Sequence, residues 1–381
     1  MKCPKCGTEM KPMEKSEILD MVTWYECPKC DEKHHIFEAV LLKYREPIWN
    51  EIESYFYHEI PGVSDLKNEV VEEKHWEMVT DYPKRKGKYT RPSLLCLTAE
   101  AMEVPLDNVI RTAAAMQTSE DWILIHDDWQ DCSDRRRGKP ALHHIYGPEL
   151  AINAGDSLHL IMWRMLRDNF DILDNETALR IMDEFYAMLQ RTTLGQTAEM
   201  LWIQQRRYDL TEDDAYYIID GKTSYYSLAG PMRLGAILAG ADEDILSTIS
   251  EFGTYLGRAF QIRDDLLDLE SDFRGLKERG GDIKEGKRSL ILIHLLNHAD
   301  ESDRRKVIDV LEKPRDEIGK DDIDLVIGLM EKYGSLEHGH SEAKKWAEKA
   351  LDALNTRMDF LKGEPREHIR WAVDFMLTRD F

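Results

Sequence analysis

The chain has 381 residues, 42% of them hydrophobic, which is enough to bury a sizeable core in one large domain or two. Its 73 acidic residues exceed its 51 basic ones, and the net charge of -22 argues against a nucleic-acid-binding protein, which must neutralise phosphates. We favour a solvated acidic surface. No apolar run approaches the roughly 20 residues that cross a bilayer, and no apolar signal-peptide segment precedes the first cysteines. We therefore expect a cytoplasmic protein without a transmembrane segment.

Two Pro-Lys-Cys turns lie near the N-terminus. Cys3 and Cys6 form one CxxC pair, Cys27 and Cys30 form another, and 20 residues separate the pairs, a spacing typical of zinc sites. Four thiolates complete a tetrahedral zinc shell. Two disulfides are the alternative, which a reducing cytoplasm disfavours. We predict a structural zinc site whose metal supplies the folding energy of a small module.

The segments "MVTWYE" at 21–26 and "HHIFEAV" at 34–40 have strand-like composition. Since four cysteines already complete the zinc shell, we interpret His34 and His35 as surface residues. From about residue 38 the periodicity becomes helical, which predicts a zinc-ribbon module at 1–37 and a catalytic domain at 38–381. Glycine and proline are expected to interrupt the helices at 61–62, 83–92, 138–148, 230–235 and 275–286.

Two motifs of the pattern DDxxD lie far apart in the chain. They consist of Asp127, Asp128 and Asp131, and of Asp264, Asp265 and Asp268. On a helix the first and last acids of each motif share one face, and carboxylates this close need a cation between them. Magnesium prefers such hard oxygen ligands and bridges protein carboxylates to phosphates. In so acidic a chain, one motif alone is weak support for a magnesium site. The residues around each motif therefore decide whether it binds magnesium.

A largely apolar helical stripe leads up to the first motif and predicts a greasy cavity below the acids. Basic residues, by contrast, gather in two short stretches of this acidic chain: Lys84, Arg85, Lys86, Lys88 and Arg91, then Arg135, Arg136, Arg137 and Lys139. Arginine forks match phosphate oxygens and lysines add point charges, so acids, magnesium and these cations together predict a diphosphate site. The alternative is that the cations pair with surface acids.

Several segments in this order resemble the trans-type polyprenyl synthetases, or isoprenyl diphosphate synthases, over about residues 40–381. They are "GKYTRP", "DDWQDCSDRRRGKP", "GQTAEM", "KTSYYS", "QIRDDLLD" and "GGDIKEGKRSL". The resemblance implies an all-α isoprenoid-synthase-type bundle around a central cavity, usually a homodimer, with both acid motifs at the cavity mouth. It also implies a magnesium-dependent prenyltransferase, in which an allylic diphosphate ionises, the double bond of isopentenyl diphosphate attacks the carbocation, and a proton is lost.

The resemblance further implies a role for each matching residue. The magnesium ions that hold the allylic diphosphate would bind Asp127, Asp128, Asp131, Asp264, Asp265 and Asp268. The same diphosphate would contact Arg136, Lys222, Gln261, Lys277 and Lys287. Isopentenyl diphosphate would contact Lys88, Arg91 and Arg137. Lys222 counts with the acids as catalytic, and with Thr223 and Gln261 it would face the carbocation.

Glu120 departs from the family pattern, because many members have a histidine seven residues before the first acid. Burying this carboxylate requires a cation, for which Lys88 or Arg91 is available. Glu120 is therefore either a rearranged part of the isopentenyl diphosphate site or a structural ion-pair partner.

Trp122 and Ile123 stand five and four residues before Asp127, where bulk sets product length in this family. We expect a product of about C15 to C20, with C20 preferred, unless Trp122 only packs the core. Two unpaired cysteines lie elsewhere: Cys96 is expected in the core, and Cys132 lies beside the first acid motif.

Two other functions fit parts of the pattern. A terpene cyclase would ionise a prenyl diphosphate with similar acids but needs no second diphosphate site, and Lys88, Arg91 and Arg137 argue against it. A non-catalytic partner subunit would be expected to lose acids from one motif, and both motifs are complete. The zinc ribbon either docks a partner protein or braces the first helix, and the sequence does not distinguish these.

Overall fold

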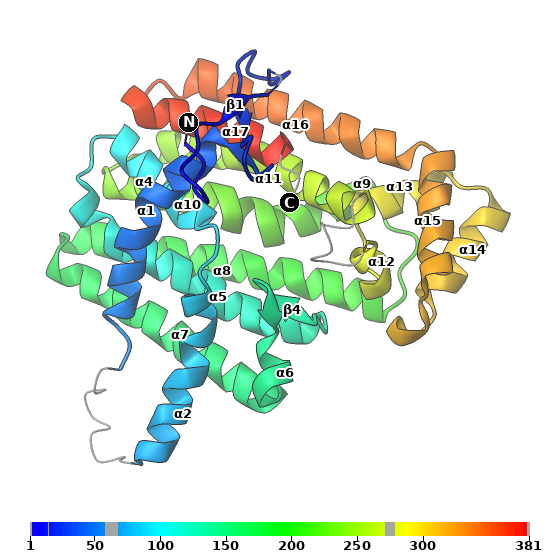
Figure 1. Cartoon of the computed structure of the whole chain (residues 1–381), viewed down its shortest axis with the longest axis horizontal. Helices are drawn as coiled ribbons and strands as arrows, with labels where there is room; N and C mark the ends of the chain where they lie inside the picture. Colours follow the sequence, from blue (N-terminus) through cyan, green and yellow to red (C-terminus); the bar gives the residue numbers. More distant parts are fainter. Residues whose placement is uncertain (1, 14, 58–67, 271–278, 379–381) are drawn as a thin grey trace.

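The computed structural model of the chain describes residues 2–13, 15–57, 68–270 and 279–378. Figure 1 shows a bundle of long helices with the N-terminal strands beside the C-terminal helix α17. The expectation of a mostly helical fold is confirmed. Lys277, predicted to hold a diphosphate, lies outside the described residues.

The N-terminal module is a small antiparallel sheet in the order β1-β2-β3, formed by β1 (Lys11–Pro12), β2 (Trp24–Glu26) and β3 (Lys33–His35). The strand expected at 34–40 ends at His35, because Ile36 begins the helix α1 (Ile36–Glu53). The His35 ring caps this helix, and its Nδ1 accepts a hydrogen bond of 3.0 Å from the Phe37 amide. Helix α1 therefore crosses the domain boundary predicted after residue 37.

The expected surface position of His35 is wrong, whereas His34 is half-buried. The His35 ring is fully buried, and its Nε2 lies 2.9 Å from Oδ2 of Asp374 in α17. The other ring, that of His34, pairs at 2.7 Å with Glu38. The sequence did not indicate the contact between His35 and Asp374, because the two residues lie at opposite ends of the chain.

The rest of the described chain is mainly helical, apart from loops and one short hairpin of strands. The first group is α2 (Glu69–Val79), α3 (Asp81–Arg85), α4 (Thr90–Ala101), η1 (Leu106–Asn108), α5 (Ile110–Gln130), α6 (Leu142–Tyr146), α7 (Pro148–Asp168), η2 (Asn169–Asp171) and α8 (Asn175–Gln204). The second group is α9 (Glu212–Ile218), η3 (Ile219–Ala229), α10 (Gly230–Leu238), α11 (Glu243–Glu270), α12 (Gly281–Glu285), α13 (Leu290–His298), α14 (Glu301–Leu311), η5 (Arg315–Glu317), α15 (Lys320–Lys332), α16 (Ser335–Arg357) and α17 (Gly363–Thr378).

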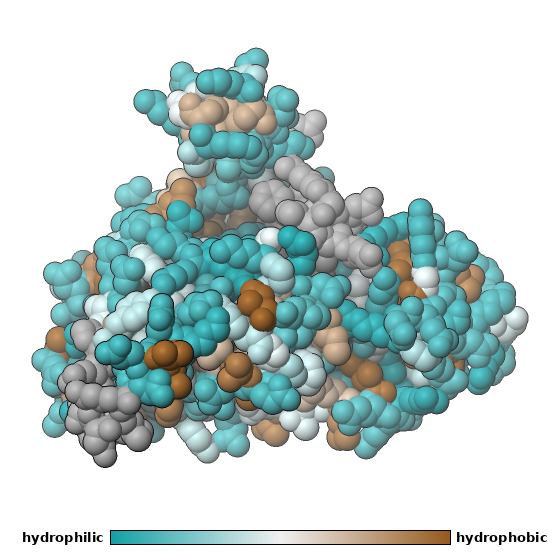
Figure 2. Space-filling model, turned by 60° about the horizontal axis from the view of Figure 1, so that its bottom comes forward, coloured by the Kyte–Doolittle hydropathy of each residue, from teal (hydrophilic) through white to brown (hydrophobic). Residues whose placement is uncertain are grey.

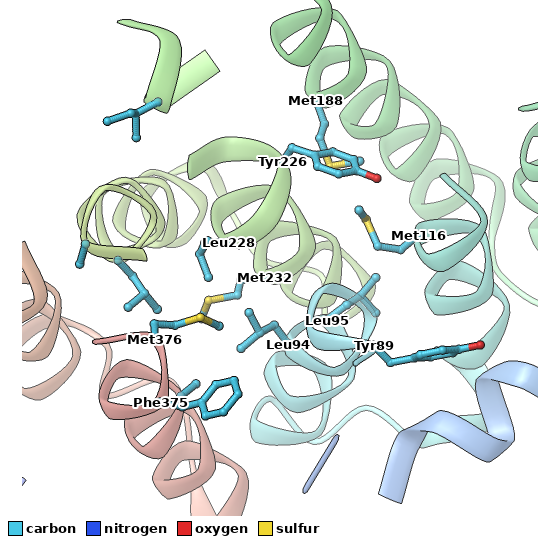
Figure 3. Close-up of a cluster of buried hydrophobic side chains, with 14 of the residues drawn as sticks. Tyr89, Leu94, Leu95, Met116, Met188, Tyr226, Leu228, Met232, Phe375 and Met376 are labelled. Carbon is cyan, nitrogen blue, oxygen red and sulfur yellow. The ribbon is translucent and has the colours of Figure 1, made fainter. Parts of the chain in front are cut away.

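Most of these helices share one hydrophobic core. Helix α5 packs against α7, α11 packs against η3 and α16, and α10 packs against α4. Figure 3 shows part of this core, where side chains of α4, α5, η3, α10 and α17 meet. The N-terminal module has a separate small cluster of Cys3, Met10 and Cys27. Cys96 lies in the main core, as expected, and Cys132 is exposed.

The interruption expected at 230–235 is a change of helix type instead of a break. Segment η3 is a π-helix that passes directly into α10, and Pro231 lies in the first turn of α10. π-Helical turns are rare and frequently lie at functional sites. The wider turn here carries Lys222 and Thr223, which line the cavity described below.

The face of the molecule in Figure 2 is mainly hydrophilic, and its hydrophobic residues are scattered. Within the described residues, no helix has the length and apolar character that a membrane span requires.

Candidate functional site

A large cavity of about 1900 Å³ opens among α4, α5, α8, η3 and α11. Most of the predicted site residues line it: Lys88, Arg91, Glu120, Trp122, Ile123, Asp127, Asp131, Arg136, Arg137, Lys222, Thr223, Gln261, Asp264, Asp265 and Lys287. Two predicted magnesium ligands, Asp128 and Asp268, are not among the lining residues. The fold therefore brings both acid motifs and both groups of cations to one space.

Asp127 faces two polar side chains across the cavity. Its Oδ1 lies 3.4 Å from Nζ of Lys222 and accepts a hydrogen bond of 3.4 Å from Gln196. Burial opposes its ionisation, but the positive charges of Lys222 and Lys287 outweigh that effect, so the pKa of Asp127 is lowered. The Asp127 carboxylate is thus held as an anion.

Asp128 points the other way and is fully buried. Arg136 donates to it from Nε at 3.0 Å and from Nη2, and the Tyr82 hydroxyl donates to Oδ2 at 2.6 Å. Asp128 therefore contacts Tyr82 and Arg136 and is not among the residues that line the cavity. In this structure Asp128 fixes Arg136 beside the cavity.

Asp131 caps the end of α5 and lies 3.6 Å from Nζ of Lys287. Burial and the neighbouring charge of Asp127 raise the pKa of Asp131 to about 7. The same lysine lies 3.1 Å from Asp282 and 2.6 Å from Glu285. Lys287 therefore links the first acid motif to the segment around α12.

The second motif, at the end of α11, is held by a chain of hydrogen bonds. Thr223 donates to Oε1 of Gln261 at 2.7 Å, and Nε2 of Gln261 donates to Asp265 at 2.8 Å. Burial and the charge of Asp282 raise the pKa of Asp265 well above its usual range. Asp268 is buried, and its Oδ2 accepts a hydrogen bond of 3.0 Å from the Asp282 amide. The last acid of this motif therefore anchors the start of α12.

Lys222 is positioned by close packing of two helices. Its Nζ lies 2.7 Å from Glu199 of α8, besides its contact with Asp127. A Cβ atom added at Gly195 would lie 2.6 Å from the backbone nitrogen of Lys222. The absence of a side chain at Gly195 thus lets η3 approach α8 closely enough for this ion pair.

A second group of charges lies around Glu120. Nη1 of Arg91 lies 3.1 Å from Oε1 of Glu120, and Nη2 of Arg137 lies 3.9 Å from the same atom. Arg91 is therefore the partner of Glu120. Arg137 also pairs at 2.8 Å with Asp121, which is buried. Burial, partly offset by Arg137, raises the pKa of Asp121 to about 6.

A tight hairpin presents Arg136 and Arg137 to the cavity. Strands β4 (Arg135–Arg136) and β5 (Lys139–Pro140) pair antiparallel, with a two-residue turn between them. Both turn residues, Arg137 and Gly138, have positive φ angles of 51° and 78°, as a type I′ turn requires. The turn directs the Arg137 guanidinium back to the Tyr82 carbonyl, at 2.8 Å.

Trp122 lies half-buried on the cavity wall, and its ring contacts two histidine rings. Its ring centroid is 4.8 Å from that of His159 and 5.6 Å from that of His126. Of the remaining predicted cations, Lys86 pairs with Glu46 at 3.0 Å and Arg85 pairs with Asp81 at 2.6 Å. Lys86 also lines the cavity, whereas Arg85 is not among the lining residues.

Several polar residues of the site were not predicted individually: Gln196, Glu199, Asp282 and Glu285, and the buried Asp121. The first four lie in "GQTAEM" and "GGDIKEGKRSL", so those motifs contained the information. Asp121 gave no such indication, because a single acid beside Glu120 in an acidic helix carries no pattern.

The four cysteine sulfurs of the N-terminal module form a compact cluster, with all four within 4.8 Å of one another. Individual Sγ–Sγ distances are 3.4 Å for Cys6–Cys27, 3.6 Å for Cys3–Cys30 and 3.9 Å for Cys6–Cys30. A tetrahedral ion with metal–sulfur bonds of about 2.3 Å needs sulfurs about 3.8 Å apart, whereas a disulfide is about 2.05 Å long. The cluster has the size of a metal site, and among the described residues it alone gathers three or more ligand atoms this closely.

Comparison with known proteins places this site in a family. A family model described as polyprenyl synthetase matches residues 72–327. A short chain isoprenyl diphosphate synthase of Methanothermobacter thermautotrophicus is 33% identical over 298 residues, which cover 77% of this chain and 87% of the relative.

Solved structures of similar proteins share the fold of this chain. Geranylgeranyl pyrophosphate synthetase from Pyrococcus horikoshii is 28% identical, with a TM-score of 0.77 and coverage of 90% of this chain and 99% of that chain. Geranylgeranyl pyrophosphate synthase from Corynebacterium glutamicum, complexed with isoprenyl diphosphate and magnesium, shares the fold at 23% identity and a TM-score of 0.78, covering 91% of this chain and 99% of that chain. The chain therefore belongs to the polyprenyl synthetase family and is a trans-prenyltransferase.

Proposed function

We propose that this protein condenses isopentenyl diphosphate with an allylic prenyl diphosphate and releases a short trans-prenyl diphosphate, mainly C20. One observation carries the proposal: a single cavity is lined by acids of both DDxxD motifs and by two separate groups of cations. Two diphosphates need two such groups. The relatives described as short-chain and geranylgeranyl diphosphate synthases support the substrate class and the product range.

The allylic diphosphate is assigned to the acid side of the cavity. Asp127, Asp131, Asp264 and Asp265 line it and offer carboxylate oxygens, the donors that magnesium prefers. Burial and neighbouring acids, Asp127 for Asp131 and Asp282 for Asp265, raise the pKa values of these two carboxyl groups. A bound cation would offset both effects, so the donor set fits magnesium. When bound, magnesium supplies positive charge that stabilises the departing diphosphate.

The protein's own cations complete this side. Lys222 and Lys287 each contact acids of the first motif or their neighbours, and Arg136 is fixed by Asp128. Preorganised charges of this kind stabilise a leaving group without reorganisation during the reaction. The Thr223 hydroxyl is directed to Gln261, so both polar groups are oriented before substrate binds.

Isopentenyl diphosphate is assigned to Lys88, Arg91 and Arg137. These residues lie on the side of the cavity around Glu120, whose carboxylate pairs with the two arginines. Glu120 therefore neutralises part of this site, in keeping with a rearranged member of it. A terpene cyclase needs no second cationic site, and a non-catalytic subunit needs neither the acid motifs nor the cationic sites. Both alternatives are therefore less well supported.

Product length is assigned to Trp122, with Ile123 beside it. The Trp122 ring is large and packs against His126 and His159, which limits its movement. We expect the wild-type protein, given labelled isopentenyl diphosphate, farnesyl diphosphate and magnesium, to stop at C20. Trp122→Ala should give longer products because it removes this barrier, and Trp371→Ala, away from the cavity lining, should not. Unchanged products from Trp122→Ala would contradict the assignment.

We further infer zinc at the cysteine cluster, whose sulfur spacing fits a tetrahedral ion. The six free cysteines suit a reducing cytoplasm. A homodimer is supported by an exposed apolar stripe on α8, formed by Leu179, Tyr186, Leu194 and Leu201, which recur at helical spacing. A second copy of the chain would cover this stripe.

A further inference from the structure

The last helix, α17, carries a buried carboxylate that the N-terminal module holds. Asp374 is completely buried, and two donors reach it from the module: the Ser16 hydroxyl donates to Oδ1, and Nε2 of His35 donates to Oδ2 at 2.9 Å. Because Nδ1 of His35 accepts from the Phe37 amide, the ring proton lies on Nε2 and points at Asp374. A buried carboxylate depends on such donors. The module and α17 therefore depend on each other at this point.

Two further contacts join the module to the end of α17, and a ring contact within the module supports them. The Trp24 indole donates to the Thr378 hydroxyl at 2.8 Å. The His35 ring lies 5.2 Å from the Trp24 ring and 5.3 Å from the Phe375 ring, measured between centroids. The contact thus covers the end of α17, at 374–378, and not the whole helix.

This end of α17 also reaches the catalytic cavity. Met376 is one of the residues that line it, and Nζ of Lys88 lies 5.8 Å from the centre of the Phe375 ring. Figure 3 shows Phe375 and Met376 within the cluster that includes Leu94 of α4 and Met232 of α10. Lys88 stands just before α4 and belongs to the cations assigned to isopentenyl diphosphate. Asp374 is therefore one residue from the groups that shape that side of the cavity.

The N-terminal module buries few hydrophobic side chains of its own apart from its cysteines. Its own buried cluster consists of Cys3, Met10 and Cys27, with Cys6, Tyr25 and Cys30 packed beside them. Modules of this size take most of their folding free energy from the metal. Loss of the metal would release Ser16 and His35 from Asp374.

We propose that Asp374 is a positioning residue through which the metal-loaded module holds the end of α17 against the second-diphosphate side of the cavity. The module is thus an internal brace for the last helix and part of the isopentenyl diphosphate site, and zinc loading sets the affinity of that site. The statement about isopentenyl diphosphate rests on the proposed function, whereas the statement about α17 does not.

Hydrogen exchange measured by mass spectrometry tests the brace without any turnover. Removing zinc from the wild-type protein with 1,10-phenanthroline, and separately Asp374→Asn, should each speed exchange at residues 370–378 by about fivefold or more. Helix α14 serves as an internal reference and should not change. Lys344→Ala is the matched control, because Lys344 contacts Glu17 of the module at 3.3 Å through an exposed ion pair that spares Asp374.

Kinetics then test the consequence for the site. Both treatments should raise KM for isopentenyl diphosphate about fivefold, and should leave kcat and KM for the allylic substrate within about twofold. If Asp374→Asn does not fold, Ser16→Ala replaces it in both measurements, because this variant removes one hydrogen-bond donor to Asp374. The zinc-free wild type is measured in either case. Unchanged exchange at 370–378 after verified zinc loss would overturn the brace, and so would equal changes in both KM values. Faster exchange in a protein without condensation activity would leave the brace standing and refute the proposed function.

Discussion

Glu120 is the residue that most clearly distinguishes this site from the family pattern. Its carboxylate lies between the guanidinium groups of Arg91 and Arg137, where a second diphosphate would bind. It therefore reduces the positive charge that the diphosphate meets. Glu120 also holds Arg91 in place. Removing its side chain would therefore add positive charge for the diphosphate but would also free Arg91. Substitution by glutamine removes the charge and keeps the shape, which separates the two effects.

We predict that Glu120→Gln lowers KM for isopentenyl diphosphate by threefold to tenfold, about 1 kcal/mol, the size of one charge interaction near 4 Å in water. Glutamine keeps the shape and a hydrogen-bonding oxygen for Arg91. Steady-state kinetics with a saturating allylic substrate measure the effect, and Glu348→Gln, at an exposed position of α16, is the control. A higher KM would mean that Glu120 acts chiefly by positioning Arg91.

Asp121 makes stability depend on pH. Burial raises its pKa from 3.8 to about 6 in the folded protein, so between these values the folded state binds the proton more tightly than the unfolded state. Its contribution to the free energy of unfolding therefore falls as pH rises from about 4 to about 6, and is constant above that.

Asp121→Asn removes this dependence. Relative to wild type, the variant should gain about 1 kcal/mol in unfolding free energy between pH 5 and pH 7, measured by urea unfolding at both values. The lost ion pair with Arg137 shifts the variant's stability at neutral pH, which is why the difference between the two pH values is the readout. An identical difference at pH 5 and pH 7 would show that Asp121 does not titrate in this range.

At the scale of elements, the contact between α8 and η3 determines where Lys222 lies. Gly195 permits that contact, and a methyl group there would meet the Lys222 backbone at 2.6 Å. Gly195→Ala should lower kcat/KM for the allylic substrate by about 10- to 100-fold, because small displacements of catalytic groups are costly.

Gly328→Ala provides the matched control, since nothing lies within 4 Å of its added Cβ atom in α15. Alanine there should leave activity unchanged and stabilise the helix by up to about 1 kcal/mol. Circular dichroism should show both variants folded. Full activity in Gly195→Ala would mean that the helices separate without moving the ion pair.

The sequence predicted the helical fold, and most of its candidate site residues lie in the cavity lining, because regular apolar spacing and ordered motifs carry that information. It did not predict which acid of each motif is absent from the cavity lining. Asp128 contacts Tyr82 and Arg136, whereas the adjacent acids Asp264 and Asp265 both line the cavity, and the two motifs have the same pattern. Nor did it predict the burial of His35, whose partner Asp374 lies at the other end of the chain. Contacts made by single residues across such distances leave no periodic pattern.

At the scale of the whole molecule, the exposed stripe on α8 predicts self-association. Tyr186 is 63% exposed and Leu194 is 52% exposed, so a helix side of this kind needs a covering partner. Tyr186→Glu should convert a dimer to a monomer in size-exclusion chromatography with light scattering, because a buried unpaired charge is costly at an interface. Leu325→Glu, on the exposed side of α15, should remain dimeric. A monomeric wild type would contradict the homodimer.

The central claim is that one cavity holds two diphosphates, of which only the allylic one is bound through acids. Calorimetric titration of the wild-type protein with isopentenyl diphosphate, and with the unreactive analogue farnesyl thiolodiphosphate, tests it directly when each is measured with and without magnesium. The analogue should bind only with magnesium, because Asp127, Asp131, Asp264 and Asp265 otherwise repel it. Isopentenyl diphosphate should bind in both conditions, through Lys88, Arg91 and Arg137. Failure of isopentenyl diphosphate to bind in either condition, or competition between the two ligands for one site, would contradict the claim and favour a cyclase.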